Sequence, residues 1–88
     1  MTDRELLERA AKAAGIHPHD IECTWNPLTH DGDALRLAVK LGITIDLVDC
    51  SAYRRTTDRL IQEYWGGDYD PSYRRAIVRT AAEIGGTS

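Results

Sequence analysis

The sequence predicts a small α+β domain, and two kinds of pattern lead to this fold class. Three segments carry apolar residues at the spacing of an amphipathic helix, and each segment ends at a glycine. Between the second and the third, apolar and polar residues alternate as in a half-buried strand. A chain of 88 residues suits one domain with one core. We therefore expect a single domain over residues 1–88, with the order α-β-α-β-β-α and a short antiparallel sheet packed on helices.

The first helix is expected to begin at the N-terminus, because Thr2 and Glu5 have the spacing of a capping box. Gly15 followed by Ile16 fits the Schellman arrangement that ends many helices. The apolar face consists of Leu6, Leu7, Ala10, Ala13 and Ala14.

The second helix is expected over residues 33–43, with an aspartate as its cap and Gly42 at its end. Leu35 and Val39 widen its apolar side, which predicts that this helix lies most deeply against the core. The candidate caps are Asp33 and Asp31, and the apolar face consists of Ala34, Leu37, Ala38 and Leu41.

The third helix is expected after Asp70, which can cap it, and Pro71, which fits the first turn. Its predicted buried face consists of Tyr73, Ala76, Ile77, Thr80, Ala81 and Ile84, and Gly85 follows. This arrangement directs Arg74, Arg75 and Arg79 toward solvent or a partner.

Two segments are expected to pair as strands. Residues 43–47 alternate as a half-buried strand does, and residues 59–65 can supply the partner after a polar connection over residues 54–58. In this interpretation Leu60 and Tyr64 share one face of the second strand. The opposite face consists of Ile61 and Trp65.

Two further assignments complete the expected sheet. The apolar residues of 59–65 also suit a short helix ended by Gly66 and Gly67, although we favour the strand. Residues 21–25 can add a short third strand, which Pro27 would end.

Composition excludes several classes of protein. No apolar run approaches the roughly 18 residues that span a bilayer, and the charged N-terminus is unlike a signal peptide. We therefore expect a cytoplasmic protein without a membrane partner, in which Cys23 and Cys50 stay reduced, although two strand-borne thiols can lie close in a small sheet. The net charge of −3, with acids and bases interleaved, lacks the basic stripe of a general nucleic-acid binder.

No residue pattern predicts catalysis or a metal site. No string suggests a nucleophile, a base and an orienting group, so we expect no enzyme and no cofactor. Asp31-Gly32-Asp33 lacks the further oxygen ligands of a calcium loop. Four zinc-type ligands lie close in sequence, but their spacing does not form the two paired knuckles of a structural site. These four are His17, His19, Cys23 and His30.

The segment from Trp25 to Leu35 is the least generic part of the chain, and two interpretations of it stay open. In the structural one, Trp25 leaves the sheet, Asn26 closes an Asx turn, and the chain enters a capped helix. In the functional one, an exposed recognition patch is formed. Its members would be Trp25, Asn26, Asp31 and Asp33.

Three strings of the sequence carry a resemblance. They are Met1–Leu7, Trp25–Leu28 with Asp31–Leu41, and Arg74–Arg79 with Ala81–Gly85. Together they resemble small uncharacterised proteins of tailed phages and their prophages. The resemblance implies a phage origin but no mechanism, because that family carries no established biochemical function. This chain departs from the family in having only residues 17–24 between its first helix and the tryptophan, where relatives have a longer strand-rich stretch.

The resemblance and the lack of a catalytic grouping lead to one functional expectation. The chain is expected to be a non-enzymatic phage accessory protein that binds and inhibits a host protein in the host cell cytoplasm. An inhibitor of host defence, of the anti-CRISPR type, is one concrete version. The alternatives are a small nucleic-acid-binding regulator that uses an arginine-rich face and a homodimeric structural module.

We choose candidate binding residues by their type, because a few residue types dominate protein interfaces. Trp, Tyr and Arg supply most hot spots, and the candidates are Tyr53, Arg55, Trp65, Tyr69, Arg74 and Arg75. All six cations of the C-terminal half are arginines, which bind phosphate or carboxylate in fork geometry: Arg54, Arg55, Arg59, Arg74, Arg75 and Arg79. They could converge on one face, or they could pair with the acidic residues of the same half.

Overall fold

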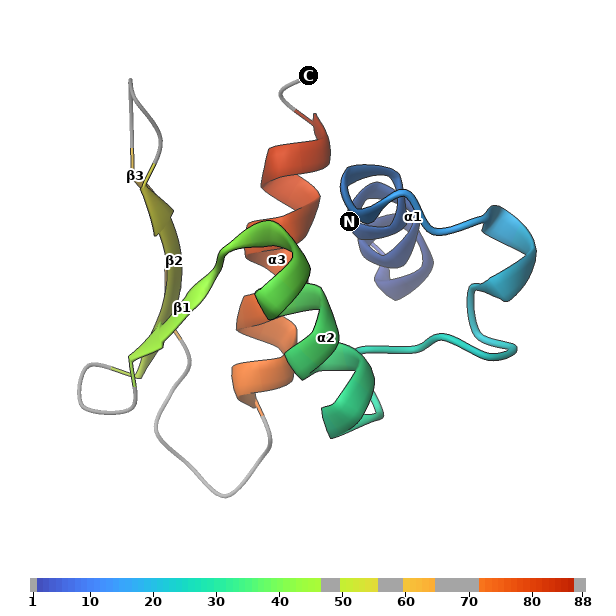
Figure 1. Ribbon diagram of the computed structural model, residues 1–88, viewed down its shortest axis with the longest axis horizontal. Coiled ribbons are helices and arrows are strands. Elements are labelled where there is room, and N and C mark those ends of the chain that lie inside the picture. The colour runs from blue at the N-terminus through green and yellow to red at the C-terminus, as the bar shows by residue number, and fades with distance from the viewer. Residues whose placement is uncertain (1, 47–49, 56–59, 65–71, 87–88) are drawn as a thin grey trace.

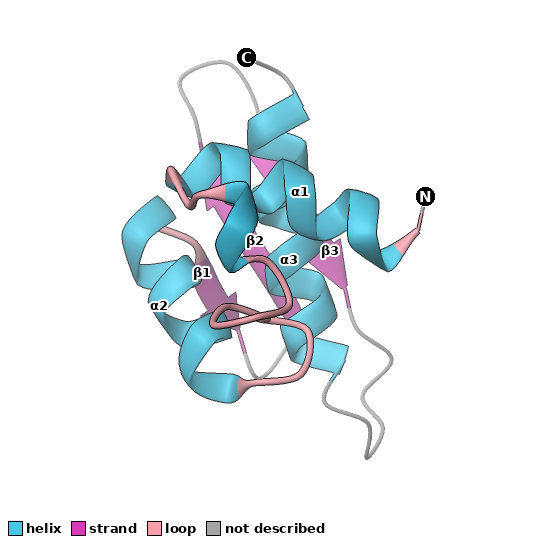
Figure 2. Cartoon of the chain, turned by 90° about the vertical axis from the view of Figure 1, so that its right-hand side faces the viewer, coloured by secondary structure: helices cyan, strands magenta, loops and turns pink. Residues whose placement is uncertain are grey.

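The computed structural model describes residues 2–46, 50–55, 60–64 and 72–86, and it confirms the α+β class. The elements are α1 (Asp3–Ala14), the 3-10 turn η1 (Pro18–Asp20), α2 (Asp31–Leu41), β1 (Thr44–Asp46), β2 (Ser51–Arg55), β3 (Leu60–Tyr64) and α3 (Ser72–Gly86). Helix α3 packs against the sheet on one side and against α1 and α2 on the other (Figure 1). Figure 2 shows the helices in front of a single face of the sheet.

Helix α1 is bounded as its sequence predicts. The backbone N–H of Glu5 donates to Thr2 Oγ1 at 3.2 Å, which caps the first turn. At the other end Gly15 adopts a left-handed φ of 71°, and the N–H of Ile16 donates to the Ala11 carbonyl at 2.8 Å. This pairing is the Schellman motif. The predicted start and end of the first helix are therefore confirmed.

Helix α2 ends as predicted but differs at its start and in its depth. It begins at Asp31, and the side chain of its N-cap residue, His30, forms no hydrogen bond with the first turn. The prediction of an aspartate cap is therefore wrong. Leu35 and Val39 are 57% and 75% exposed. The prediction that this helix lies deepest is also wrong, because α2 covers only one flank of α3.

Residues 21–25 form a tight turn rather than the expected strand. The Asp20 carbonyl accepts N–H groups from Cys23, Thr24 and Trp25 at 2.9 to 3.1 Å. These local bonds replace sheet pairing, and only an isolated bridge joins Ile21 to Trp25. Both of these apolar residues are buried, so their spacing reflects a turn that returns to the core.

The sheet has the order β1-β2-β3 with antiparallel pairs, and its central strand is one that the sequence did not predict. Residues 60–64 are confirmed as a strand, but their partner is β2 rather than the expected strand over residues 43–47. Strand β2 overlaps the segment over residues 54–58 that was expected to be a polar connection. The sequence does not mark it as a strand, because Ala52 is its one buried apolar residue. Across the sheet Ala52 lies opposite both Ile45 and Glu63.

The core is arranged around α3. Ile77, Val78 and Thr80 are fully buried, and the Thr80 hydroxyl donates to the carbonyls of Ala52 and Ala76. The predicted apolar face of this helix is confirmed but too narrow, since burial extends to Val78, Ala82 and Gly85. A helix covered on both sides buries more than one stripe. Asp70 and Pro71, the predicted start of this helix, lie outside the described residues.

Helices α1 and α3 approach each other through small residues. A Cβ placed on Gly85 would lie 2.2 Å from the Arg9 carbonyl oxygen and 3.3 Å from Ala13 Cβ. Real Cβ atoms do not come this close to a backbone oxygen, so this crossing requires glycine. The neighbouring surfaces are small as well, and they include Ala10, Ala14 and Ala82.

Replacing Ile77 by Ala should lower the free energy of unfolding by about 2 to 4 kcal/mol, because the change leaves a cavity in the core. Denaturant unfolding followed by circular dichroism measures it. Leu35→Ala, at a position that is 57% exposed, is the matched control. A loss below about 0.5 kcal/mol at Ile77, the range of exposed sites, would contradict the central place of α3.

Replacing Gly85 by Ala should destabilise the protein, although alanine favours a helix by about 1 kcal/mol over glycine. The added methyl group must push the Arg9 backbone away, and overpacking of this kind costs about 1 to 3 kcal/mol. Gly32→Ala in α2 is the control, since its Cβ would meet only the end of the Arg36 side chain at 3.4 Å. A stabilised Gly85 variant would show that α1 and α3 are farther apart.

Candidate functional site

The outer face of the sheet is the candidate binding surface, and alternation along the strands decides which residues it carries. Ala52 of β2 and Ile61 of β3 are buried toward α3. The residues that alternate with them along these two strands therefore point away from the helices. In Figure 1 no described helix lies on that side of the sheet. We call this surface the outer sheet face, and it consists of Tyr53, Arg55, Leu60, Gln62 and Tyr64 on β2 and β3, together with Thr44, Asp46 and the buried Ser51.

Large apolar side chains are exposed on the outer sheet face. Leu60 is 46% exposed and Tyr64 is 62% exposed, and both belong to β3. Tyr53 lies directly opposite Gln62, and Arg55 lies opposite Leu60, so two tyrosines, a leucine and an arginine share one surface. Tyrosine and arginine are the residue types that anchor protein interfaces.

Two of the six candidate residues thus lie together, two others lie elsewhere, and two are not among the described residues. Tyr53 and Arg55 are on the outer sheet face, while Arg74 and Arg75 are on α3, on the opposite side of the sheet. Trp65 and Tyr69 lie outside the described residues. Leu60 and Tyr64 were not among the candidates, although their alternation with Ile61 had placed them on one face.

Arg74 is a structural residue in this fold. Its side chain is 18% exposed, its Nη1 lies 2.5 Å from Asp31 Oδ1, and its Nε donates to the Leu28 carbonyl at 3.2 Å. The expectation that it points toward solvent is wrong, because it joins the start of α3 to the start of α2.

The same aspartate also accepts the Tyr73 hydroxyl proton. These hydrogen bonds, first from Tyr73 and then from Arg74, lower the pKa of the Asp31 carboxyl below its ordinary value. The bond to Asp31 in turn raises the pKa of Tyr73. We call Asp31, Tyr73 and Arg74 the Asp31 clamp.

The segment that leads from Trp25 into α2 follows the structural interpretation, in which a buried tryptophan is followed by an Asx turn and a helix. Trp25 is buried, and the Asn26 side chain accepts the N–H of Leu28 at 3.1 Å, which is the expected Asx turn. Asp33 Oδ2 accepts the N–H of Asn26 at 2.9 Å, so this carboxylate holds the loop instead of capping the helix. The side chains proposed for a recognition patch are thus largely engaged within the fold.

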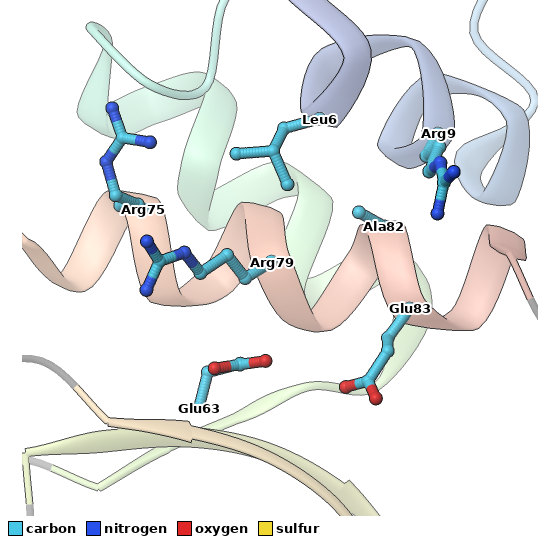
Figure 3. Close-up of a pocket in the computed structure, with 7 residues that line it drawn as sticks. All are labelled: Leu6, Arg9, Glu63, Arg75, Arg79, Ala82 and Glu83. Carbon is cyan, nitrogen blue, oxygen red and sulfur yellow. The ribbon is translucent and has the colours of Figure 1, made fainter. Parts of the chain in front are cut away.

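A hollow of about 360 Å³ lies between α1, α3 and β3, and it is lined by charges of both signs (Figure 3). Arg9, Arg75 and Arg79 contribute guanidinium groups, and Glu63 and Glu83 contribute carboxylates. Burial raises the pKa of Glu63, the neighbouring Glu83 adds to the rise, and Arg79 opposes it.

Arg75, at the edge of this hollow, pairs with a residue of α1. Its Nη1 lies 2.9 Å from Asp3 Oδ1, and this contact lowers the pKa of the Asp3 carboxyl. Arg54 and Arg55 are adjacent in β2 and point to opposite faces of the sheet. The described arginines of the C-terminal half therefore do not all converge on one face, and Arg74 and Arg75 both pair within the chain.

The part of the chain that the structure describes contains no group of three or more His, Cys, Asp or Glu placed to hold a metal ion. His17 and His19 stack on each other with ring centroids 4.7 Å apart, and Cys23 and Cys50 are reduced thiols. In the same residues, no helix is both long and apolar enough to cross a membrane.

No protein-family model matches this sequence, and no curated protein or solved structure shows significant similarity to it. Geometry and residue chemistry alone therefore define the candidate site.

Replacing Asp31 by Asn should lower the melting temperature at pH 7, and this difference from wild type should shrink in acid. A carboxyl whose pKa is lowered by folding stabilises the protein above its unfolded pKa, and that contribution is lost as the pH falls through the folded pKa. Thermal unfolding of both proteins between about pH 7 and pH 3 measures the effect. A difference that stays constant over this range would show that the Asp31 charge does not hold the clamp.

Proposed function

We propose that this chain is a non-enzymatic binding protein that occupies a surface of another protein through its outer sheet face. The observation that carries the proposal is the exposure of Leu60 and Tyr64 on a face that no described helix covers. Exposed apolar residues that gather on one surface mark interaction sites more often than scattered ones do. Two of the expected binding residues, Tyr53 and Arg55, belong to the same surface.

The chemistry of the outer sheet face favours a protein as the partner. Its side chains offer one cation, Arg55, and one carboxylate, Asp46, and the remaining members are aromatic, aliphatic, hydroxyl or amide groups. Such a surface can bury apolar area at its centre and form hydrogen bonds at its rim, as protein interfaces do. A nucleic-acid surface would need several cations in a row, and this face provides Arg55 alone among the described residues.

The resemblance of three sequence strings to small phage proteins supports a more specific version. In this version the chain is a phage accessory protein that inhibits a host protein in the host cell cytoplasm. A host-defence protein, as for inhibitors of the anti-CRISPR type, is one target class that fits stoichiometric binding without catalysis. The resemblance supports the phage origin, and the inhibition is proposed from that origin together with the lack of a catalytic grouping in the sequence.

The double variant Arg55→Glu/Tyr64→Ala should lose the host protein that the wild type captures, with binding at least about tenfold weaker if these are hot-spot residues. Affinity capture from host lysate with mass spectrometry identifies the captured protein, and titration with that protein, once purified, gives the affinity. Both side chains are exposed, so the melting temperature should stay close to that of wild type.

The matched control is Val39→Ala/Lys40→Glu, which changes one exposed apolar residue and one cation on α2. It should capture the same protein as wild type. Binding to duplex DNA at two salt concentrations tests the nucleic-acid alternative, since phosphate binding weakens steeply with salt. Retained capture by the Arg55→Glu/Tyr64→Ala variant would rule out the outer sheet face as the interface.

A further inference from the structure

Strand β3 is an edge strand of the described sheet, and two of its five residues are exposed large apolar side chains. The strand order places β2 on one side of β3, and no described strand lies on the other side. An unpaired edge leaves backbone N–H and C=O groups available to another strand. Two of the four exposed large apolar residues of the described chain, Leu60 and Tyr64, stand at the two ends of this strand.

The sequence of β3 allows the strand to pair with a second copy of itself in the opposite direction. If two copies pair antiparallel around Gln62, Leu60 of each copy lies opposite Tyr64 of the other, and Ile61 lies opposite Glu63. A leucine and a tyrosine that meet across two strands remove apolar surface from water. This register pairs all five residues of the strand and keeps each of them on its own face.

Charge selects this register over its neighbours. Glu63 is the one charged residue of β3. A two-fold axis at Glu63 would set the two carboxylates directly opposite each other, which is destabilising. An axis at Ile61 would remove Tyr64 from the pairing within the strand. The axis at Gln62 avoids both effects.

The opposite edge of the sheet is less suited to pairing. Strand β1 is three residues long, from Thr44 to Asp46, so it offers fewer backbone groups and places a carboxylate at its end. Short, charged strands are a common way in which proteins protect an edge.

We propose that two copies of this chain associate through β3, antiparallel and centred on Gln62, to form a continuous six-stranded sheet. The association doubles the outer sheet face, because Tyr53, Arg55, Leu60 and Tyr64 of both copies then lie on the same side. The contact area of two five-residue strands is small, which predicts a weak and concentration-dependent dimer. The inference does not depend on the identity of the host partner.

Sedimentation or light scattering over a concentration series up to about 1 mM, the range of weak interfaces, tests the dimer. The wild-type mass should rise from that of the 9.8 kDa chain toward twice this value. Leu60→Lys and Tyr64→Glu should each remain monomeric, because each removes both leucine–tyrosine pairs. An equimolar mixture of the two variants should associate, since one Lys–Glu pair and one intact leucine–tyrosine pair then form. Val39→Lys on α2, a control away from the edge, should behave as wild type.

A wild type that stays monomeric throughout the series would overturn the proposal. So would single variants that associate as wild type does, and a folded mixture that fails to associate would overturn the Gln62 register. If a variant loses its fold, hydrogen exchange of the wild type decides. Protection of β3 amides must then rise with concentration while that of β1 amides stays unchanged, and equal behaviour of the two edges would overturn the inference.

Discussion

The rest of the structure depends on the contact between α1 and α3. These helices come close enough that a Cβ on Gly85 would collide with a carbonyl oxygen, and small side chains line the approach on both sides. Such close packing compensates for the small size of the individual alanine side chains, because many atoms meet at contact distance. It also fixes the position of α3, which in turn supports the sheet through Ala52 and Thr80.

A second, polar contact complements this packing at the other end of α3. The Asp31 clamp joins the first turns of α2 and α3, two segments separated by 42 residues or more in sequence. Carboxylates are favourable at helix N-termini, so Asp31 suits its position in α2 even without a capping bond. Asp33 lies only two residues further along the same helix, yet its carboxylate holds the Asn26 backbone and not α3. The two carboxylates therefore fasten the start of α2 in two directions.

Local signals in the sequence predicted the fold class, the start and end of α1 and the end of α2, whereas α3 continues through Gly85, where the sequence had predicted its end. Gly15 and Gly42 end their helices because a left-handed residue is needed at those points, and this need is encoded within a few residues. Burial was harder to predict. Val78 is fully buried because α3 has neighbours on both sides, and Val39 is exposed because α2 has a neighbour on only one. Neither fact can be inferred from periodicity within one helix.

For the candidate site too, local patterns predicted some features and could not predict those that depend on distant parts of the chain. The alternation of β3 correctly placed Leu60 and Tyr64 on one face, since strand periodicity is local. It could not show that β2 lies beside them, because pairing with a polar strand leaves little trace in that strand's own sequence. The role of Arg74 depends on Asp31 and Leu28, which come from a distant part of the chain. An arginine on the polar side of a helix gives no sign of such a partner.

The central place of α3 has a consequence for how the chain is made. Because α3 follows every other described element, α1, α2 and the strands leave the ribosome before the helix that joins them exists. Their apolar faces must remain uncovered until that point, and the closure of such a long loop slows folding. During synthesis the contacts that α3 makes with the other elements are therefore the last to form.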